Sequence, residues 1–249
     1  MSRKIRVGID INEVLRARWL QFDRFYAQEF GEDGAPKPQP YCYDFFKTYR
    51  WNDTVEKVKE LKEPEEMAKY DNASPTTYQV DEKTGEAPVD AFLFKKEEEI
   101  KLTAKEVYNR FMFEDYCFEI HASATMMYKG MDLHLKNFLL KYDKTAKFVV
   151  TSIENPFSIP PTLFFLSKIT SRFKEYKFVE EGHQMWDDVD VLITSDPEIL
   201  KMGTPWGRKL IKVKRPYNED IKAGSLEILQ INDLIDNKEF EKIIKYKNK

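Results

Sequence analysis

The feature that most constrains this sequence is a series of short, almost continuously apolar segments separated by segments of helical periodicity. Strands that are apolar on both faces are typical of a parallel sheet that helices cover on both sides. The sequence therefore predicts an α/β fold with a mostly parallel, Rossmann-type sheet. The predicted strands are residues 5–11, 146–150, 177–179, 189–193, 209–213 and 227–231.

Between the first two strands, apolar residues recur mainly at helical spacing. We therefore predict a core made of residues 1–20 and 146–249, with residues 21–145 inserted as a mainly helical cap. Residues 71–88 have the turn residues of an exposed connector. The predicted helices are residues 14–30, 41–66, 104–116, 124–142, 155–176 and 198–202.

The composition excludes several classes of protein. The 249 residues carry a net charge of only −3 with mixed signs, which gives no sign of nucleic-acid or membrane binding. Two cysteines, three scattered histidines and no signal-like or membrane-spanning run predict a cytoplasmic, reducing location without disulfides or a zinc site.

Polar residues follow three of the predicted strands at their carboxyl ends, which is where parallel α/β sheets place their chemistry. These are Asp10 and Asn12, the pair Thr151 and Ser152, and residues 194–196. If the strands are neighbours, the three groups face one crevice. An aspartate, hydroxyls and further acidic residues would suit phosphoryl transfer through an aspartyl-phosphate with Mg²⁺.

Four segments resemble motifs of the haloacid-dehalogenase-like (HAD) phosphatases, most closely those of the 5'(3')-deoxyribonucleotidase branch. Residues 10–15 (Asp-Ile-Asn-Glu-Val-Leu) are similar to the first motif, and Thr151-Ser152 to the phosphate-holding second motif. Residues 190–197 (Asp-Val-Leu-Ile-Thr-Ser-Asp-Pro) resemble the fourth motif, and residues 215–218 (Arg-Pro-Tyr-Asn) a segment after the last core strand. The resemblance covers residues 5–20 and 146–219 and implies a HAD-like fold.

The resemblance also implies that most of the catalytic site has been lost. Asp10 would be the nucleophile, but the general acid two residues later is Asn12, which cannot deliver a proton. The paired metal-binding aspartates fall on Thr194 and Ser195, whose neutral hydroxyls are poor Mg²⁺ ligands. The phosphate-binding lysine falls near Gln184.

Simpler interpretations remain open for these residues. Asp10, Asn12, Thr151 and Ser152 are all residue types that cap helices. The tryptophans Trp51, Trp186 and Trp206 are suited to a nucleoside-stacking pocket but equally to a core.

Other residues could restore a site. Asp187, Asp188 or Asp196 could rebuild a metal site, although loop and cap roles are the commoner use of such residues. Lys168 could replace the lost lysine from the preceding helix.

These departures predict a catalytically degenerate HAD-like protein without a cofactor, kept as a structural or interaction module. Its partner would be a protein bound through the cap or an aromatic surface. The Lys-, Asn- and Tyr-rich composition is typical of AT-rich genomes, including those of many phages, and fits a virion subunit. The alternatives are an active Mg²⁺-dependent nucleotidase with relocated ligands, and a pseudoenzyme that binds a nucleotide without cleaving it.

Overall fold

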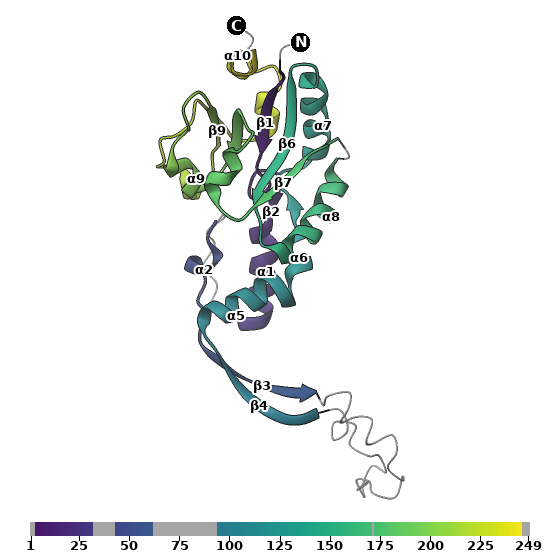
Figure 1. The fold of residues 1–249 in the computed structure, drawn as a ribbon, viewed down its shortest axis with the longest axis vertical. Helices are drawn as coiled ribbons and strands as arrows, with labels where there is room; N and C mark the ends of the chain where they lie inside the picture. Colours follow the sequence, from purple (N-terminus) through teal and green to yellow (C-terminus); the bar gives the residue numbers. More distant parts are fainter. Residues whose placement is uncertain (1–2, 32–42, 62–93, 171, 246–249) are drawn as a thin grey trace, which may run out of the picture. The chain divides into compact units, whose positions relative to one another are not determined.

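The computed structural model describes residues 3–31, 43–61, 94–170 and 172–245. Its centre is a six-stranded sheet in which every recorded pairing is parallel, in the order β10-β9-β8-β1-β6-β7 (Figure 1). The predicted α/β fold with a parallel sheet is confirmed. The strands are β1 (Ile5–Ile9), β6 (Ala146–Ile153), β7 (Tyr176–Val179), β8 (Val191–Thr194), β9 (Lys209–Val213) and β10 (Leu226–Ile228).

Strand β1 lies at the middle of this sheet, between β6 and β8. Ile9, the last residue of β1, pairs with Val150 on one side and Ile193 on the other. Because all three strands run in the same direction, the residues that follow these positions meet at the carboxyl edge of the sheet. The register thus brings together the three polar groups that the sequence places at strand ends.

Apolar side chains on the two faces of the sheet belong to two separate clusters. In β8, Val191 and Ile193 belong to the larger cluster and Leu192 to the smaller one. Successive residues of a strand point to opposite faces. This explains why the strands are apolar throughout instead of alternating.

Helices and short helical turns connect the strands and cover the sheet. The helices α7 (Met131–Tyr142) and α8 (Ile159–Ile169) contribute to the larger cluster, and α9 (Pro197–Met202) to the smaller one. Helix α10 (Lys238–Lys245) packs Phe240 and Ile244 into the larger cluster. Short 3-10 turns are η4 (Pro156–Ser158), η5 (Gly182–Trp186), η6 (Pro216–Asn218) and η7 (Ile231–Leu234).

An aromatic cluster organises the helices that follow β1. Phe22 of α1 (Arg18–Phe30) stacks on Phe45 of α2 (Phe45–Thr48), with ring centroids 4.2 Å apart. Phe111, which opens the π-helical turn η3 (Phe111–Asp115), meets Phe22 edge-on. Helix α6 (Cys117–His121) follows, and the short strands β2 (Arg16–Ala17) and β5 (Thr125–Met126) pair antiparallel.

Four of the helices predicted from sequence are partly wrong. The predicted helix 14–30 begins at Arg18, after β2, and the helix within residues 155–176 ends at Ile169. The predicted helix 124–142 begins at Met131, because residues 125–126 pair with β2. The predicted helix 41–66 is helical only in α2, and Thr54–Leu61 is strand β3. The spacing of Val55, Val58 and Leu61 fits a helix, but pairing with a distant segment decides the outcome.

That partner of β3 is β4 (Phe94–Leu102), and the two strands pair antiparallel. They belong to a second compact unit, residues 51–108, whereas residues 1–50 and 109–249 form the first. Helix α5 (Ala104–Arg110) begins in the second unit. The predicted connector 71–88 lies outside the described residues, and the boundaries 21–145 of the cap stay a prediction.

Among the described residues, no helix is long and apolar enough to cross a membrane.

Candidate functional site

Asp10 lies at the carboxyl edge of the sheet, where both of its carboxylate oxygens accept hydrogen bonds. It is 1% exposed, and its backbone amide continues the β1–β8 ladder by donating to Ile193 O. Oδ1 accepts from the Ile11 amide at 2.7 Å and from Ser152 Oγ at 3.1 Å. Oδ2 accepts from Thr194 Oγ1 at 2.6 Å. The carboxylate is therefore held by donors from three neighbouring segments.

The two hydroxyls at the expected metal-binding positions donate to the oxygens beside them. Thr194 donates to Asp10, as described, and Ser195 Oγ donates to the Asn12 carbonyl oxygen at 3.3 Å. Mg²⁺ requires oxygen ligands in octahedral geometry, with anionic carboxylates preferred. Thr194 and Ser195 have neutral hydroxyls, which donate hydrogen bonds here and offer no carboxylate ligand.

Asn12 connects Asp10's surroundings to a deeper ion pair. Its amide nitrogen donates to Ser152 Oγ and to Glu154 Oε1, both at 3.1 Å. Its amide oxygen accepts from Arg16 Nε at 2.9 Å. Since both ends of the amide are bonded to protein, Asn12 is fixed in place and has no proton to give a leaving group.

The ion pair of Arg16 and Glu154 lies behind Asn12. Arg16 Nη2 lies 2.7 Å from Glu154 Oε1, and their side chains are 0% and 1% exposed. Arg16 Nη1 also donates to Thr162 Oγ1 at 2.7 Å, while Ser158 Oγ donates to Glu154 Oε2 at 2.7 Å. Burial lowers the pKa of Arg16, and the adjacent Glu154 carboxylate opposes that shift. The guanidinium therefore stays a buried cation with a carboxylate partner.

Asp196 has a double structural role at the same edge. Its Oδ1 accepts from the Glu198 and Ile199 amides and caps helix α9. Its Oδ2 accepts from Tyr43 Oη at 2.6 Å. Nearby, Tyr217 Oη donates to Ser195 Oγ at 2.9 Å. Both tyrosines are partly buried and cover the residues that follow β8.

Two buried acids in this region have strongly shifted pKa values. Burial raises the pKa of Asp10 to about 7, the Asp196 charge adds to the rise, and the hydrogen bond from Thr194 opposes it. Burial also raises the pKa of Glu13 to about 7, against the nearby Arg18 charge. Shifts of this size are found at functional sites and also in buried structural networks.

Two residues proposed from sequence have other roles, and a third has no recorded hydrogen bond. Gln184 Oε1 accepts from the Glu180 and Glu181 amides and caps its own turn η5. Lys168 Nζ donates to the Ala122 carbonyl at 3.3 Å and lies over the Phe164 ring. Thr151 Oγ1 is buried with no recorded hydrogen-bond partner, so only Ser152 of the predicted pair contacts Asp10.

Asp187 and Asp188 precede strand β8 and so lie towards the opposite edge of the sheet. The Asp188 carbonyl accepts from Arg6 Nε at 2.5 Å, and Arg6 belongs to the start of β1. Asp187 forms an ion pair with Lys177 at 3.4 Å. A four-residue strand is about 13 Å long, so these carboxylates cannot join Asp10 at a metal. In the described part of the chain, no group of three potential metal ligands comes together.

Trp186 and Trp206 do not line a common stacking pocket. Trp186 is 4% exposed and belongs to the smaller apolar cluster, whereas Trp206 is 99% exposed. Trp51, in the second unit, packs edge-on against Tyr108. The core interpretation is right for Trp186.

Two residues of segment 215–218 form hydrogen bonds to backbone carbonyls near the strand ends. Asn218 Nδ2 donates to the Ser195 carbonyl at 2.8 Å and to the Val213 carbonyl at 3.1 Å. Arg215 Nε donates to the Glu13 carbonyl at 2.9 Å. Both side chains therefore bind backbone oxygens beside the Asp10 site.

No protein-family profile and no curated protein matches the sequence. Among solved structures, a haloacid dehalogenase-like hydrolase from Burkholderia xenovorans is 12% identical, with a TM-score of 0.51 over 95% of this chain and 97% of that one. The chain has a HAD-like fold. A HAD-superfamily hydrolase of subfamily IA from Geobacter sulfurreducens is 10% identical, with a TM-score of 0.47 over 94% of this chain and 95% of that one.

Sequence reasoning missed three residues that define the site: Arg16, Glu154 and Tyr43. Glu154 had a usable signal, because it follows the second polar strand end by two residues. Arg16 is six residues after Asp10 and is brought back by the turn at Glu13, whose φ of 57° is left-handed. Nothing in the sequence near Tyr43 indicates its contact with Asp196.

Proposed function

We propose that this chain is a catalytically inactive HAD-like protein that serves as a structural or protein-interaction module. The observation that carries the proposal is the set of hydrogen bonds that Thr194, Ser152 and the Ile11 amide donate to Asp10. A carboxylate nucleophile directs a lone pair of one oxygen at phosphorus. In this chain, protein donors take three of the roughly four lone-pair sites of the Asp10 carboxylate.

The surrounding groups support the same proposal. The acid position holds Asn12, and a missing general acid costs about 10²–10⁴-fold in rate. The carboxylates around Asp10 do not fit a Mg²⁺ site, because Asp196 is engaged by Tyr43 and by two backbone amides. Arg16 supplies a buried positive charge, but its donors are directed at Asn12, Thr162 and Glu154.

An exposed aromatic surface supports the interaction role. Phe118 and Phe164, on α6 and α8, pack with ring centroids 5.3 Å apart and are 51% and 46% exposed. Phe157, which is 65% exposed, lies in the turn η4 that leads into α8. Exposed apolar groups of this kind mark surfaces that proteins bury against one another. We expect the chain to have this role within a larger assembly, such as a phage virion.

A phosphatase assay tests the absence of catalysis. Nucleoside monophosphates are incubated with Mg²⁺ and either the wild-type chain or Asp10→Asn, and released phosphate is measured. We expect equal rates for both proteins, at the level of the buffer. Turnover in the wild type that is lost in Asp10→Asn would establish the rival function, a live Mg²⁺-dependent nucleotidase.

The interaction role is tested separately, by the size of the complexes that contain this chain in extracts of its native source. We expect Phe157→Ser with Phe164→Ser to shift the chain from large complexes to the monomer fraction. The matched pair Trp206→Ser with Leu229→Ser removes two other exposed apolar side chains. An equal shift for both pairs would contradict a specific role for the α6–α8 surface.

A further inference from the structure

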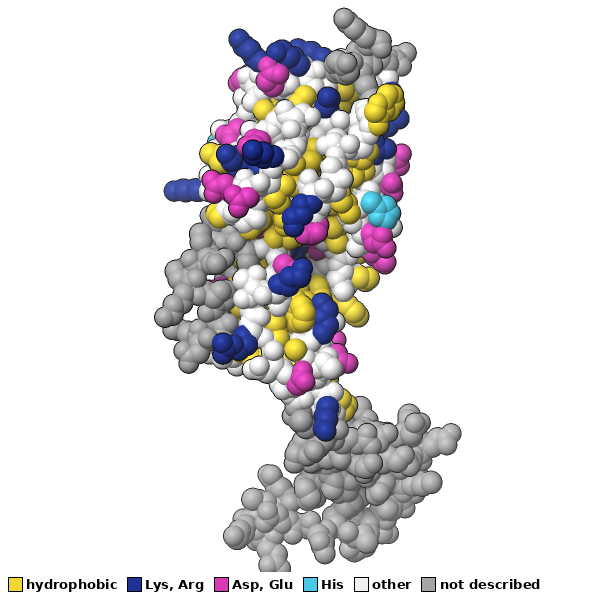
Figure 2. Space-filling view, turned by 90° about the vertical axis from the view of Figure 1, so that its left-hand side faces the viewer, with side chains coloured by type: hydrophobic (Ala, Val, Ile, Leu, Met, Phe, Trp, Pro, Cys, Tyr) yellow, Lys and Arg dark blue, Asp and Glu magenta, His cyan; other side chains and the backbone are white. Residues whose placement is uncertain are grey.

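A basic cavity lies at the amino edge of the sheet, opposite the edge that holds Asp10. It has a volume of about 1090 Å³ and is lined by residues along the length of α7, by the starts of β1 and β6, by the end of α8 and by the segment before β7. Seven of its fifteen lining residues are Lys or Arg, and two are Asp. On the face in Figure 2, by contrast, Lys and Arg lie among Asp and Glu.

Some of these cations are already bound within the protein. Lys4 Nζ donates to the Asp143 carbonyl at the end of α7, which complements the negative end of a helix. Arg6 and Lys147 both form ion pairs with Glu175. These three side chains therefore have a structural explanation.

Four further cations of the cavity have no such explanation. Arg3, Lys136, Arg172 and Lys174 line it, and no described carboxylate lies within ion-pair distance of any of them. All four are exposed. Like charges that share one concave surface repel one another, and a bound anion relieves that repulsion.

The cavity also has an apolar part. Leu139, Ala146 and Ile169 are buried and line it, and the half-buried ring of Phe148 and the 55% exposed side chain of Leu133 complete this part. Exposed apolar atoms beside cationic groups suit a ligand that has an apolar ring at one end and several negative charges at the other.

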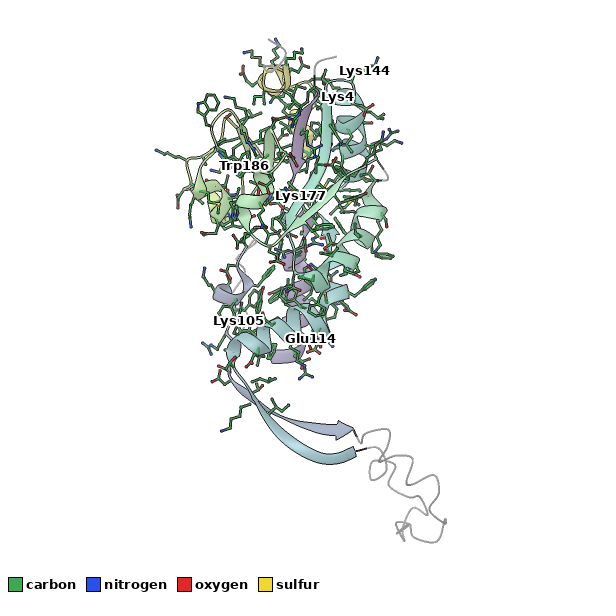
Figure 3. All side chains as sticks on the ribbon, viewed as in Figure 1. Lys4, Lys105, Glu114, Lys144, Lys177 and Trp186 are labelled. Atoms are coloured by element: carbon green, nitrogen blue, oxygen red, sulfur yellow. The ribbon has the colours of Figure 1, made fainter. Side chains whose placement is uncertain are left out.

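We infer that this cavity binds a nucleoside polyphosphate, with its phosphates on the four unpaired cations and its base against Leu133 and Phe148. Cavities that bind small molecules have volumes of about 300–1,000 Å³, so this one is large enough. The site is independent of the proposed function, because Asp10 does not line the cavity and follows the far end of β1, a five-residue strand about 16 Å long. Figure 3 shows Lys4 and Lys144 together at this end of the molecule.

The size and shape of the site favour a small ligand over a polymer or a membrane. A membrane surface would need an extended, flat arrangement of basic and apolar groups. A nucleic-acid backbone would need a basic stripe that continues beyond the cavity. The unpaired cations are instead collected around one hollow.

Calorimetry with ATP, in low salt and with EDTA to exclude metal-dependent binding, tests the inference. We expect saturable binding with one site per chain, and binding that weakens as salt is added. The triple variant Lys136→Gln, Arg172→Gln, Lys174→Gln should bind ATP at least about tenfold more weakly. The matched triple variant Lys129→Gln, Lys201→Gln, Lys238→Gln removes the same charge outside the cavity and should stay within about twofold of the wild type.

Inorganic triphosphate, which lacks a base, shows which part of the nucleotide is recognised. Leu133→Ser should weaken binding of ATP while leaving inorganic triphosphate unaffected, because only the base contacts that side chain. No saturable ATP binding at millimolar concentration would overturn the inference, as would equal weakening by both triple variants. Affinity for single-stranded oligonucleotides that exceeds that for ATP and grows with length would replace the small ligand with a nucleic acid.

Discussion

Charged side chains gather at both edges of the six-stranded sheet, but the two groups are built differently. At the carboxyl edge, Asp10, Arg16 and Glu154 are at most 4% exposed, and each is hydrogen-bonded to other protein groups. At the amino edge, Arg172 and Lys174 are exposed and have no described ion-pair partner. One edge neutralises its charges internally, and the other leaves positive charge facing solvent.

The two edges allow folding stability and ligand binding to be changed separately. Buried charges must be paired, so removing one partner leaves the other uncompensated at a cost of several kcal/mol. Exposed charges are screened by water and contribute about 0–1 kcal/mol to folding. Substitutions at the carboxyl edge should therefore change the free energy of unfolding, and substitutions at the amino edge should change ligand affinity.

The largest effect is expected for Arg16→Met, which leaves Glu154 as an unpaired buried carboxylate. We expect the free energy of unfolding to fall by about 4 kcal/mol, measured by urea denaturation. The double variant Arg16→Met, Glu154→Gln removes both charges and should lose less than Arg16→Met alone. If the double variant lost as much stability as Arg16→Met, or more, the two side chains would not act as a pair.

The second prediction concerns pH and rests on the raised pKa of Asp10. Between 3.8, its ordinary value, and about 7, the folded protein keeps a proton that the unfolded chain has released. Stability is therefore highest below this range and falls as pH rises through it. Asp10 alone would account for about 4 kcal/mol, and Glu13, shifted in the same direction, would add to the decline.

Asp10→Asn tests the assignment, because the amide does not titrate. We expect the variant to lose less stability than the wild type between pH 5 and pH 8, an interval of about three units around the shifted pKa. Ser152→Ala is the matched control, since it removes one hydrogen bond but keeps the titrating carboxyl. If Asp10→Asn kept the pH dependence of the wild type, other groups would cause the loss of stability with rising pH.

Two tyrosine hydroxyls, one bonded to a buried carboxylate and one on an exposed side chain, give a smaller and more direct comparison. Tyr43→Phe removes the donor to the buried Asp196 carboxylate and should cost about 2 kcal/mol. Tyr176, at the start of β7, is 40% exposed, and its hydroxyl donates to the Phe173 carbonyl at 3.3 Å. Tyr176→Phe should cost less than about 0.5 kcal/mol, because water can replace the lost bond. Thermal unfolding of both variants would show the difference, and equal costs would contradict it.

Much of the fold follows from the sequence because its strands are local and strongly patterned. The run at residues 191–193 is apolar on both faces, and the fold places those faces in two separate clusters. The strand Thr54–Leu61 could not be identified in this way, because its partner is Phe94–Leu102, far along the chain. Its charged residues and its spaced valines are equally typical of an exposed helix.

The site was predictable where a residue directly follows a strand. Asp10, Ser152 and Thr194 meet because register alone determines their positions. Arg16 was not predictable, because its reach back to Glu154 depends on a left-handed residue at position 13. Contacts made by long side chains across a turn carry no periodic signal in the sequence.

The smallest effect on folding is expected from the triple variant Lys136→Gln, Arg172→Gln, Lys174→Gln. Its free energy of unfolding without ligand should stay within about 0.5 kcal/mol of the wild type, and any change should be an increase, because like charges are removed. With ATP present, a ligand that binds only the folded state adds about 2.7 kcal/mol at a concentration 100 times its Kd. Urea denaturation with and without ATP should therefore separate the two proteins only when ATP is present. A loss of several kcal/mol in the variant without ATP would mean that these cations stabilise the amino edge, as Arg16 does the carboxyl edge.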